Sequence, residues 1–450
     1  MSAPTLVPAE CALPGSPLAN AQSGIDACVH CGFCLQACPT YLTLEDENDS
    51  PRGRIVLMRA LLDGTLAPTN ESVETHIARC LGCRACETVC PSGVPYGHLL
   101  EATRATLAEH RPIPFVARTI LGSFERPWLM RLVMAGGRVL RATGVARLFS
   151  RLPGRVGFAM AMLSSTTRPR SGERAYAPTN RESPNGSRRG TVAVLTGCVM
   201  EGLFAQTNRA TERTLVMNDY ALVDAPGQQC CGALHAHAGD AAAARRLAKV
   251  NIEAFERTGA EYIAVNAAGC GAMMKEYGRL LADDPEWRVR ADRMSDKVRD
   301  VSELLSAAGP KRGGPLRIRV AYDAPCHLLH AQRVAASPLD LLRAVPELEL
   351  VPLVESDVCC GSAGIYNLVE PDTSNIVLER KLGHVANAEP EVVASGNPGC
   401  LMQIGAGLLR AGSRIGTVHP VELLDRSYAA VRTHTGTLDN VAPEGSGSTT

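Results

Sequence analysis

The chain has 450 residues, enough for about two to four domains. Hydrophobic residues make up 45% of it and charged residues 20%, which excludes a wholly disordered, collagen-like or coiled-coil protein. The 46 Lys and Arg residues equal the 46 Asp and Glu residues, so the overall charge attracts neither nucleic acid nor an anionic membrane. No apolar run reaches about 18 residues, and Met1–Leu6 lacks the basic and apolar parts of a secretory signal. We therefore expect a cytoplasmic protein without a membrane-spanning segment.

The 17 cysteines are the most informative feature of the composition. Thiols clustered in a reducing compartment indicate metal or redox chemistry rather than disulfides. Cys11 stands alone in a proline-containing segment, 1–22, which is predicted to be a flexible leader without a chemical role. The other 16 cysteines form two blocks of eight.

The first block contains the spacing C-x2-C-x2-C-x3-C-P twice, at Cys28–Pro39 and Cys80–Pro91. In this ferredoxin spacing three thiolates bind one cluster and the fourth binds the other. The sequence therefore predicts two [4Fe-4S] clusters. One would be bound by Cys28, Cys31, Cys34 and Cys90, and the other by Cys80, Cys83, Cys86 and Cys38. Zinc knuckles or buried apolar thiols are the alternatives, but zinc typically uses two separated pairs of ligands.

The 41 residues between Cys38 and Cys80 are too many for a minimal ferredoxin. They include two segments of helical character, 55–62 and 72–79, so we expect a mainly helical two-cluster domain over 23–110. Arg52 and Arg54 lie in the same insertion. They either offset the negative charge of a cluster and raise its potential or belong to a solvated turn.

Residues 111–163 are strongly basic, with nine arginines and one acidic residue, Glu125, interleaved with apolar residues such as Trp128. A basic amphipathic segment is typical of a helix that contacts a membrane surface or a partner protein. The alternative is a pair of connecting helices with solvated arginines. Residues 164–190, rich in Ser, Pro, Arg and Gly, are predicted to be an exposed linker.

The second block of cysteines is an internal repeat. Cys198, Cys230, Cys231 and Cys270 are matched by Cys326, Cys359, Cys360 and Cys400, at offsets of 128, 129 and 130 residues. Both Cys-Cys pairs continue into glycine. The repeats are predicted to span 191–315 and 316–432, and 433–450 to be a disordered tail.

Each repeat is predicted to be a small α/β unit, because strand-like segments alternate with alanine-rich helical ones. The predicted strands are 191–196, 220–224, 261–266, 316–322, 348–354 and 391–394, and helices include 241–257 and 374–385. Cysteines that follow parallel strands gather at the carboxyl edge of the sheet. Four thiols would therefore converge in each repeat, where they could hold a further cluster, bind zinc, form a redox-active dithiol or only pack. The predicted fold class is α+β, multidomain: a mainly helical ferredoxin module followed by two tandem α/β cysteine-rich repeats.

The order of these motifs resembles the iron-sulfur subunits of glycolate oxidase (glycolate dehydrogenase), over about residues 23 to 428. The segments that carry the likeness are 27–34, 49–55, 86–94, 268–278 and 359–366. The resemblance implies an electron-transfer subunit of a 2-hydroxy-acid oxidoreductase. A partner flavoprotein would oxidise glycolate to glyoxylate, and electrons would pass through this chain toward a quinone or another acceptor. Subunits of D-lactate, glycerol-3-phosphate or heterodisulfide-type oxidoreductases are the alternative within the superfamily.

One departure limits what the resemblance implies. Heterodisulfide reductase relatives have a fifth repeat cysteine for a non-cubane cluster, whereas Met273 and Gln403 stand at the matching positions here. We therefore do not transfer that cluster.

No flavin or nucleotide fingerprint occurs in the sequence, so FAD is expected only on a partner subunit. No nucleic-acid-binding module is recognisable either. Four histidines close to the repeat cysteines are candidates for ligands or proton carriers: His235, His237, His327 and His330. The expected location is the cytoplasm, with peripheral contact to the inner membrane as an open alternative.

Overall fold

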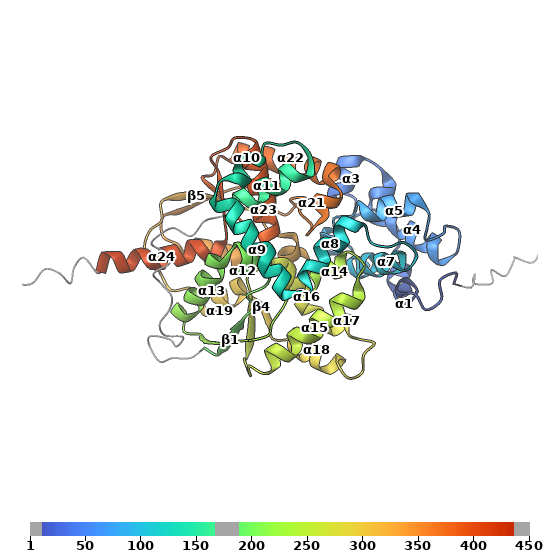
Figure 1. Ribbon diagram of the computed structural model, residues 1–450, viewed down its shortest axis with the longest axis horizontal. Coiled ribbons are helices and arrows are strands. Elements are labelled where there is room, and N and C mark those ends of the chain that lie inside the picture. The colour runs from blue at the N-terminus through green and yellow to red at the C-terminus, as the bar shows by residue number, and fades with distance from the viewer. Residues whose placement is uncertain (1–10, 167–188, 436–450) are drawn as a thin grey trace, which may run out of the picture.

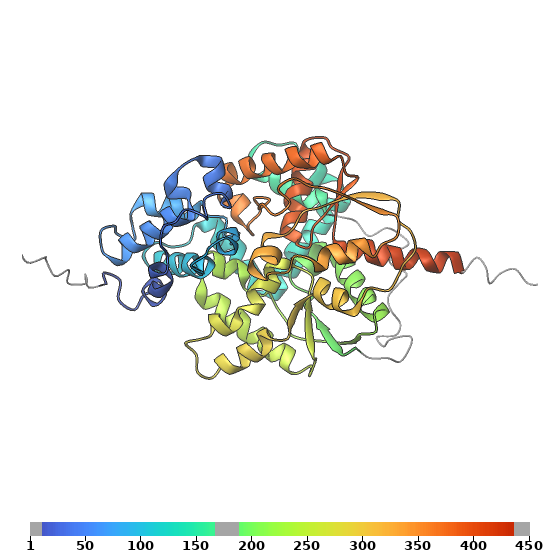
Figure 2. The same cartoon turned by 180° about the vertical axis from the view of Figure 1, so that it is seen from behind.

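The computed structural model describes residues 11–166 and 189–435. A mainly helical N-terminal region forms one end of the molecule, and two α/β units make up most of the rest (Figures 1 and 2). This arrangement confirms the predicted α+β, multidomain fold class. Most of the predicted linker and of the predicted C-terminal tail lies outside the described residues.

The predicted flexible leader is folded in the part that the structure describes. Leu18 is fully buried, and its N–H donates a hydrogen bond to Thr106 Oγ1 over 3.0 Å. Ala21 is also buried in the same core. The structure differs from the prediction here because apolar side chains at these positions gain free energy by leaving water.

The helical region is built from short elements around one apolar core. Its elements are α1 (Pro17–Asn20), α2 (Gln22–Asp26), α3 (Pro39–Leu44), the 3-10 turn η1 (Glu47–Asp49), α4 (Pro51–Leu62), α5 (Glu71–Ala78), α6 (Ala85–Thr88) and α7 (Tyr96–His110). Ser50 caps α4 by accepting from Gly53 N, and Asn70 caps α5 by accepting from Ser72 N and Val73 N. Caps of this kind start the two helices that the insertion between the motifs predicts.

The basic segment is helical as well. It forms α8 (Phe115–Phe124), α9 (Pro127–Ala142), α10 (Val145–Phe149) and α11 (Gly154–Ser165). One side of α9 packs on α12 (Val199–Leu203), where Arg138 donates to Gly202 O over 3.2 Å. The segment α11 packs against α23 (Pro398–Arg410). These helices therefore connect the helical region to both repeats.

The strands in the described part of the chain form two parallel sheets of four strands each. The first sheet has the order β2-β1-β3-β4 and the second β6-β5-β7-β8, so the two repeats share one topology. The strands are β1 (Thr191–Val194), β2 (Ala221–Val223), β3 (Tyr262–Val265), β4 (Val298–Asp300), β5 (Ile318–Tyr322), β6 (Leu348–Val351), β7 (Val392–Ala394) and β8 (Gly416–Val418).

Six of these strands overlap the predicted ones, and β4 and β8 were not predicted. Both are only three residues long. Asp300 also caps the helix that follows β4, in a capping box with Glu303, so the local sequence indicates a helix start rather than a strand.

The helices of the repeats cover both sheets. They are α13 (Ala205–Met217), α14 (Ala233–His237), α15 (Ala241–Glu256), α16 (Ala268–Lys275), α17 (Tyr277–Leu280), α18 (Arg288–Ser295), α19 (Val301–Ala308), the π-helical turn η3 (His327–Ala331), α20 (Ser337–Arg343), α21 (Tyr366–Val369), α22 (Pro371–Ala388) and α24 (Pro420–Thr435). One buried cluster includes Leu215 and Leu304 of the first repeat with Leu341 and Leu424 of the second. The two repeats therefore share a core.

Candidate metal centres

The first group of thiols lies at the surface of the helical region. A single pocket is lined by Cys28, Cys31, Cys34 and Cys90. Cys31 is exposed, and the other three are half-buried. Burial raises the pKa of the Cys34 thiol to about 11. A thiolate at this position therefore needs a bound cation to stabilise it.

The second group lies directly behind the first. A second pocket is lined by the buried Cys38, Cys80, Cys83 and Cys86. Burial raises the pKa of both Cys83 and Cys86 well above the ordinary value of a thiol. Pro51, Cys86 and Tyr96 line both pockets, so the two groups are neighbours.

Each ferredoxin motif thus places three thiols in one pocket and its fourth in the other. Cys38 precedes α3 and Pro39 is the first residue of that helix, while Cys90 follows α6 and precedes Pro91. The structure brings together the two sets of four cysteines that the spacing predicts. That these sets bind iron stays a prediction.

The two ferredoxin loops share an unusual backbone. The residues on either side of the second cysteine are left-handed in both motifs: His30 (φ 52°) and Gly32 (φ 88°), and Gly82 (φ 62°) and Arg84 (φ 65°). A non-glycine residue in this region costs about 1–2 kcal/mol. The two loops have this same shape. Eight thiols line the two pockets together, with Cys86 at both, and they fit two [4Fe-4S] clusters in the number and the chemistry of the donors.

A permanent positive charge lies beside the second group. Arg54 is fully buried and lines the second pocket. It donates to His76 O (2.6 Å), to Thr40 Oγ1 (3.1 Å) and to Asp49 Oδ1 (3.1 Å). The alternative of a solvated turn therefore does not apply to Arg54. Arg52 is partly exposed, pairs with Glu47 and lines the first pocket.

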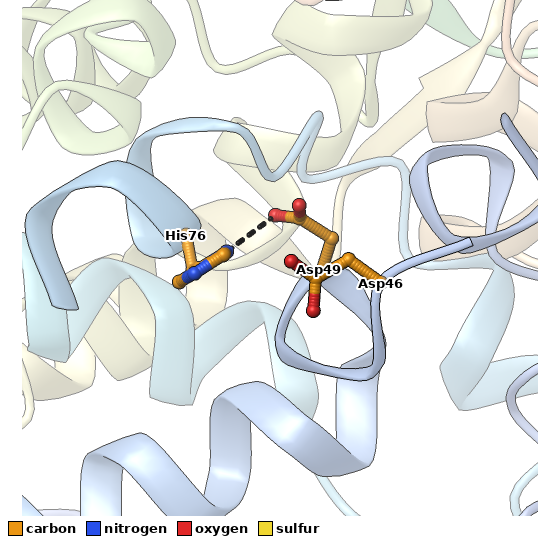
Figure 3. A group of neighbouring side chains, drawn as sticks. All are labelled: Asp46, Asp49 and His76. Carbon is orange, nitrogen blue, oxygen red and sulfur yellow. Dashed lines mark ion pairs between the residues drawn. The ribbon is translucent and has the colours of Figure 1, made fainter. Parts of the chain in front are cut away.

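Asp46, Asp49 and His76 also lie close enough together to be considered as metal ligands (Figure 3). Asp49 Oδ1 already pairs with Arg54 and with His76 Nδ1 (3.1 Å each), and Oδ2 pairs with Arg79 (3.0 Å). Asp46 instead caps η1. Two arginines would repel a cation here, so this cluster is an ion-pair network that holds Arg54 in place.

Two groups close to the sulfurs were missed in the sequence. Thr40 Oγ1 lies 3.2 Å from Cys38 Sγ, and the hydroxyl of Tyr96 lies 3.6 Å from Cys80 Sγ. Hydrogen bonds to cluster sulfurs are one of the means by which proteins set a cluster's potential. Thr40 is adjacent to a motif and could have been noticed, but the position of Tyr96 depends on how α7 packs.

The four thiols of the first repeat also converge. Cys198 hydrogen-bonds to Cys230, and Cys231 to Cys270. The bond to Cys230, together with burial, raises the pKa of Cys198 well above its ordinary value. These cysteines follow β1, β2 and β3, so they meet at the carboxyl edge of the first sheet.

The second repeat gathers Cys326, Cys359, Cys360 and Cys400 in the same way. Cys326 Sγ donates to Cys359 Sγ over 4.0 Å. This bond and one from Cys360 hold the pKa of Cys359 well below its ordinary value. The neighbouring Lys381 ammonium forms a buried ion pair with Asp323 (2.8 Å). The second repeat therefore favours a thiolate at Cys359.

The second thiol group of the helical region is in contact with the second repeat. Cys83 belongs to the same buried cluster as Cys326 and Cys359. Tyr366, from α21, donates to Arg79 O over 2.7 Å across the same boundary. Three groups of thiols thus follow one another from the exposed Cys31 into the interior of the molecule.

The four candidate histidines lie at the boundaries between domains. His327 Nδ1 is 3.5 Å from Cys326 Sγ, and its ring centroid lies 5.3 Å from that of His237. Burial lowers the pKa of His327 to about 3, so its ring is neutral. His330 hydrogen-bonds to Thr88 of the helical region (2.9 Å), and His235 is fully buried. Of the four, only His327 lies within hydrogen-bonding distance of a cysteine sulfur in the described residues.

Two family models match the chain. A "4Fe-4S dicluster domain" matches residues 24–94, and a "Cysteine-rich domain" matches twice, at 192–275 and 320–405. The matched ranges coincide with the helical region and with the two repeats.

Curated proteins match over most of the chain. The "Probable glycolate oxidase iron-sulfur subunit" of Bacillus subtilis is 37% identical over 426 residues, covering 88% of this chain and 92% of the relative. The "Glycolate oxidase iron-sulfur subunit" of Escherichia coli is 32% identical, covering 91% of this chain and 95% of the relative. "Lactate utilization protein A" of Geobacillus kaustophilus is 29% identical, covering 52% of this chain and 98% of that protein.

Among the residues that the structure describes, no helix is both long and apolar enough to cross a bilayer.

Proposed function

We propose that this chain, which belongs to the family of glycolate oxidase iron-sulfur subunits, carries electrons from a partner flavoprotein that oxidises glycolate to glyoxylate toward a quinone-type acceptor. The FAD that accepts the hydride from glycolate belongs to the partner. This chain is the electron-transfer subunit of the oxidoreductase, in the cytoplasm.

The observation that carries the proposal is the continuity of the thiol groups. The first pocket contains the exposed Cys31, and the second shares Cys86 with it. Cys83 of the second then lies in the same buried cluster as Cys359 of the second repeat. Neighbouring one-electron centres in this order would form a path from the surface to the interior.

Two [4Fe-4S] clusters would supply reversible one-electron chemistry at the two ferredoxin-type pockets. Cys28, Cys31, Cys34 and Cys90 would hold the first, and Cys80, Cys83, Cys86 and Cys38 the second. Arg54 would hold a positive charge beside the second ligand set. Tyr96 would orient the Cys80 sulfur by donating a hydrogen bond to it, while the Thr40 hydroxyl, which donates to Asp49 O, would lie beside the Cys38 sulfur.

The repeat cysteines would extend the same path. The donor set of each repeat is four thiols within hydrogen-bonding contact, which suits one further cluster or metal ion per repeat. The low pKa of Cys359 means that one ligand is already disposed to be a thiolate.

Anaerobic purification tests the cofactor assignment. Two ferredoxin-type clusters give a brown protein with about eight irons and eight acid-labile sulfides per chain, and an excess over eight irons indicates loaded repeats. A colourless, zinc-containing protein would reject the electron-transfer role.

The substrate is tested with the natural complex. The partner flavoprotein is co-purified with this chain, and dye reduction is measured with glycolate and with D-lactate. Faster reduction with glycolate supports the proposal. Faster reduction with D-lactate favours the alternative function, which the similarity to lactate utilization protein A supports.

The role of the second repeat is tested by replacing Cys359 and Cys360 with serine. We expect slower electron delivery from the flavoprotein to a quinone analogue, with both ferredoxin-type EPR signals intact. Loss of those signals would instead mean that the repeat only supports the structure of the helical region.

A further inference from the structure

The helices α8 to α10 and the turn that follows them carry an unusual concentration of exposed apolar side chains. Of 19 large apolar residues that are clearly exposed in the described ranges, 11 lie between residues 115 and 156. They are Phe115, Val116, Trp128, Leu132, Val133, Val139, Leu140, Leu148, Phe149, Leu152 and Val156. The helices that carry most of them are neighbours, since α8 and α10 both pack on α9, and a large exposed apolar area on a folded protein marks a binding face.

The face is presented by the free side of α9. Trp128 and Leu132 are each 62% exposed, and Val139 is 59% exposed. Their spacing of four and seven residues puts them on one stripe of the helix. The opposite stripe, which includes Met130 and Met134, packs toward α12. Figure 1 shows α8 and α9 on the face turned toward the viewer, and in Figure 2 they lie behind the rest of the molecule.

The same surface is positively charged. Residues 111–163 contain nine arginines and one acidic residue, whereas the whole chain is neutral, with 46 basic and 46 acidic residues. The rest of the chain is therefore net acidic, and positive charge is concentrated on these helices. Arg118, Arg126, Arg131, Arg147 and Arg151 are all exposed among the apolar residues.

An arginine-lined cavity opens beside this surface. Arg147 and Arg151 flank it from α10 and the turn that follows, and Arg410 from the end of α23. Ser150 and Ser413 complete its polar lining, and its volume is about 440 Å³. No acidic residue is among the described residues that line it. Three guanidinium groups around one cavity favour an anionic group such as a phosphate.

We propose that α8, α9 and α10 form a docking surface for a bilayer rich in anionic phospholipid, with the arginine-lined cavity taking the phosphate of one headgroup. Trp128, Leu132 and Leu148 would enter the boundary between headgroups and acyl chains. The flanking arginines would remain at the level of the phosphates, as in interfacial amphipathic helices.

The chemistry of the surface fits an anionic bilayer. Exposed Trp128 and Leu132 are accompanied by arginines and by only one acidic residue, Glu125, which is the composition of an interfacial amphipathic helix that binds anionic lipid. The proposal adds a contact surface to the proposed function, because a quinone acceptor would be dissolved in the bilayer. Vesicle binding requires neither substrate nor partner, so it can fail or succeed independently of that function.

The test is flotation of the whole chain, with its clusters, on vesicles of phosphatidylcholine alone and of phosphatidylcholine mixed with phosphatidylglycerol. We expect binding to the anionic vesicles that weakens as salt is added. Replacing Arg147 and Arg151 with glutamine should weaken it about fivefold for each arginine removed. Replacing Trp128 and Leu132 with serine should weaken it about tenfold.

Matched controls lie elsewhere on the surface. Val354 is 62% exposed, like Trp128, and Arg317 is an exposed arginine paired with Glu347. Val354→Ser and Arg317→Gln should bind vesicles as the unmodified chain does. Because all replaced side chains are exposed, thermal unfolding should be unchanged, which separates lost docking from lost folding.

Three results would overturn the proposal. The first is equal binding to neutral and anionic vesicles, and the second is unchanged vesicle binding by both double variants. The third is loss of flavoprotein co-purification in these variants while vesicle binding persists, which would make the surface a protein interface. The cavity itself is tested with inorganic phosphate. If phosphate raises the melting temperature of the unmodified chain but not of Arg147→Gln/Arg151→Gln, and this variant still binds vesicles as the unmodified chain does, the cavity binds a free anion and not a lipid headgroup.

Discussion

Cys38 and Cys90 are the residues whose partners are least evident along the chain. Each completes the pocket formed by three cysteines of the other motif. Both pockets are lined by thiols of both motifs, so the two halves of the helical region meet at each of them. Replacing either residue should therefore alter the pocket that is formed mainly by the cysteines of the other motif.

Cys38→Ser should alter the EPR signal of the cluster held mainly by Cys80, Cys83 and Cys86. Cys90→Ser is the matched variant and should alter the other signal. Both effects follow from the loss of one thiolate out of four. A change confined to the cluster of the mutated motif would show that the exchange does not occur.

Arg54 sets the charge next to the second ligand set. Removing it in Arg54→Gln should lower the midpoint potential of that cluster, because the oxidised state carries less negative charge than the reduced one. The shift is about 60 mV for each 1.4 kcal/mol of charge stabilisation lost. EPR-monitored redox titration measures it for the two clusters separately.

Two controls accompany this variant. Arg54→Gln with Asp49→Asn removes one positive and one negative charge, so it should restore most of the potential. Arg52→Gln changes a partly exposed arginine at the first pocket and should leave the second cluster's potential unchanged. Unaltered potentials in all three variants would contradict a tuning role for Arg54.

The helix α22 is anchored to the second sheet by a buried ion pair. Lys381 Nζ lies 2.8 Å from Asp323 Oδ1, and both side chains are 2% exposed. Lys381 also donates to Glu355 O over 2.5 Å. The pair lies next to Cys359, so the position of α22 and the environment of the repeat thiols depend on one contact.

Lys381→Met should lower the free energy of unfolding by about 3–5 kcal/mol, because it leaves the Asp323 carboxylate buried without its ion-pair partner. Adding Asp323→Leu should recover much of the loss. The partly exposed pair Lys249–Asp284 provides a control, since Lys249→Met should cost about 1 kcal/mol or less. Denaturant titration measures all three, and equal costs for the two lysines would contradict the prediction.

The two repeats are joined through buried polar contacts as well as through their shared core. His419 Nδ1 accepts from Val421 N, and Nε2 donates to Asn266 O of the first repeat, at 3.1 Å each. Arg213 of the first repeat pairs with Asp425 of the second. Buried polar networks of this kind stabilise folded proteins. We therefore expect the two repeats to unfold as one unit.

Burial lowers the pKa of His419 to about 4, against about 6.5 in the unfolded chain. Because the folded pKa is the lower one, the unfolded state binds the extra proton first as the solution is acidified. The stability that His419 contributes is complete above about pH 6.5 and is lost as the pH falls toward 4. The expected loss is about 3 kcal/mol.

His419→Gln tests this dependence. Denaturant unfolding between pH 4 and 7 should be less steep in pH for the variant than for the unmodified chain. Comparing the two chains under the same conditions removes contributions from other titrating groups. Parallel pH profiles would show that His419 is not neutral and buried in the folded molecule.

The sequence by itself determined the sets of thiols and the repeated α/β design. The spacing within each ferredoxin motif fixes which cysteines share a loop, because three or four residues leave little freedom to the chain. The offsets of 128 to 130 residues identify one topology used twice, and both sheets have the same strand order. Patterns of this kind are local or periodic, so they can be recognised in the sequence without knowledge of how the chain packs.

Only the tertiary structure decided the contacts between distant segments. These contacts include the buried cluster that Cys83 shares with Cys359, the position of Tyr96 next to Cys80 and the burial of Leu18. No local pattern connects the parts of the chain that they join. The same is true of the exposed stripe of α9, because an amphipathic sequence does not tell which face is covered. These features depend on which apolar surfaces meet and exclude water, and that is settled by the packing of the whole molecule.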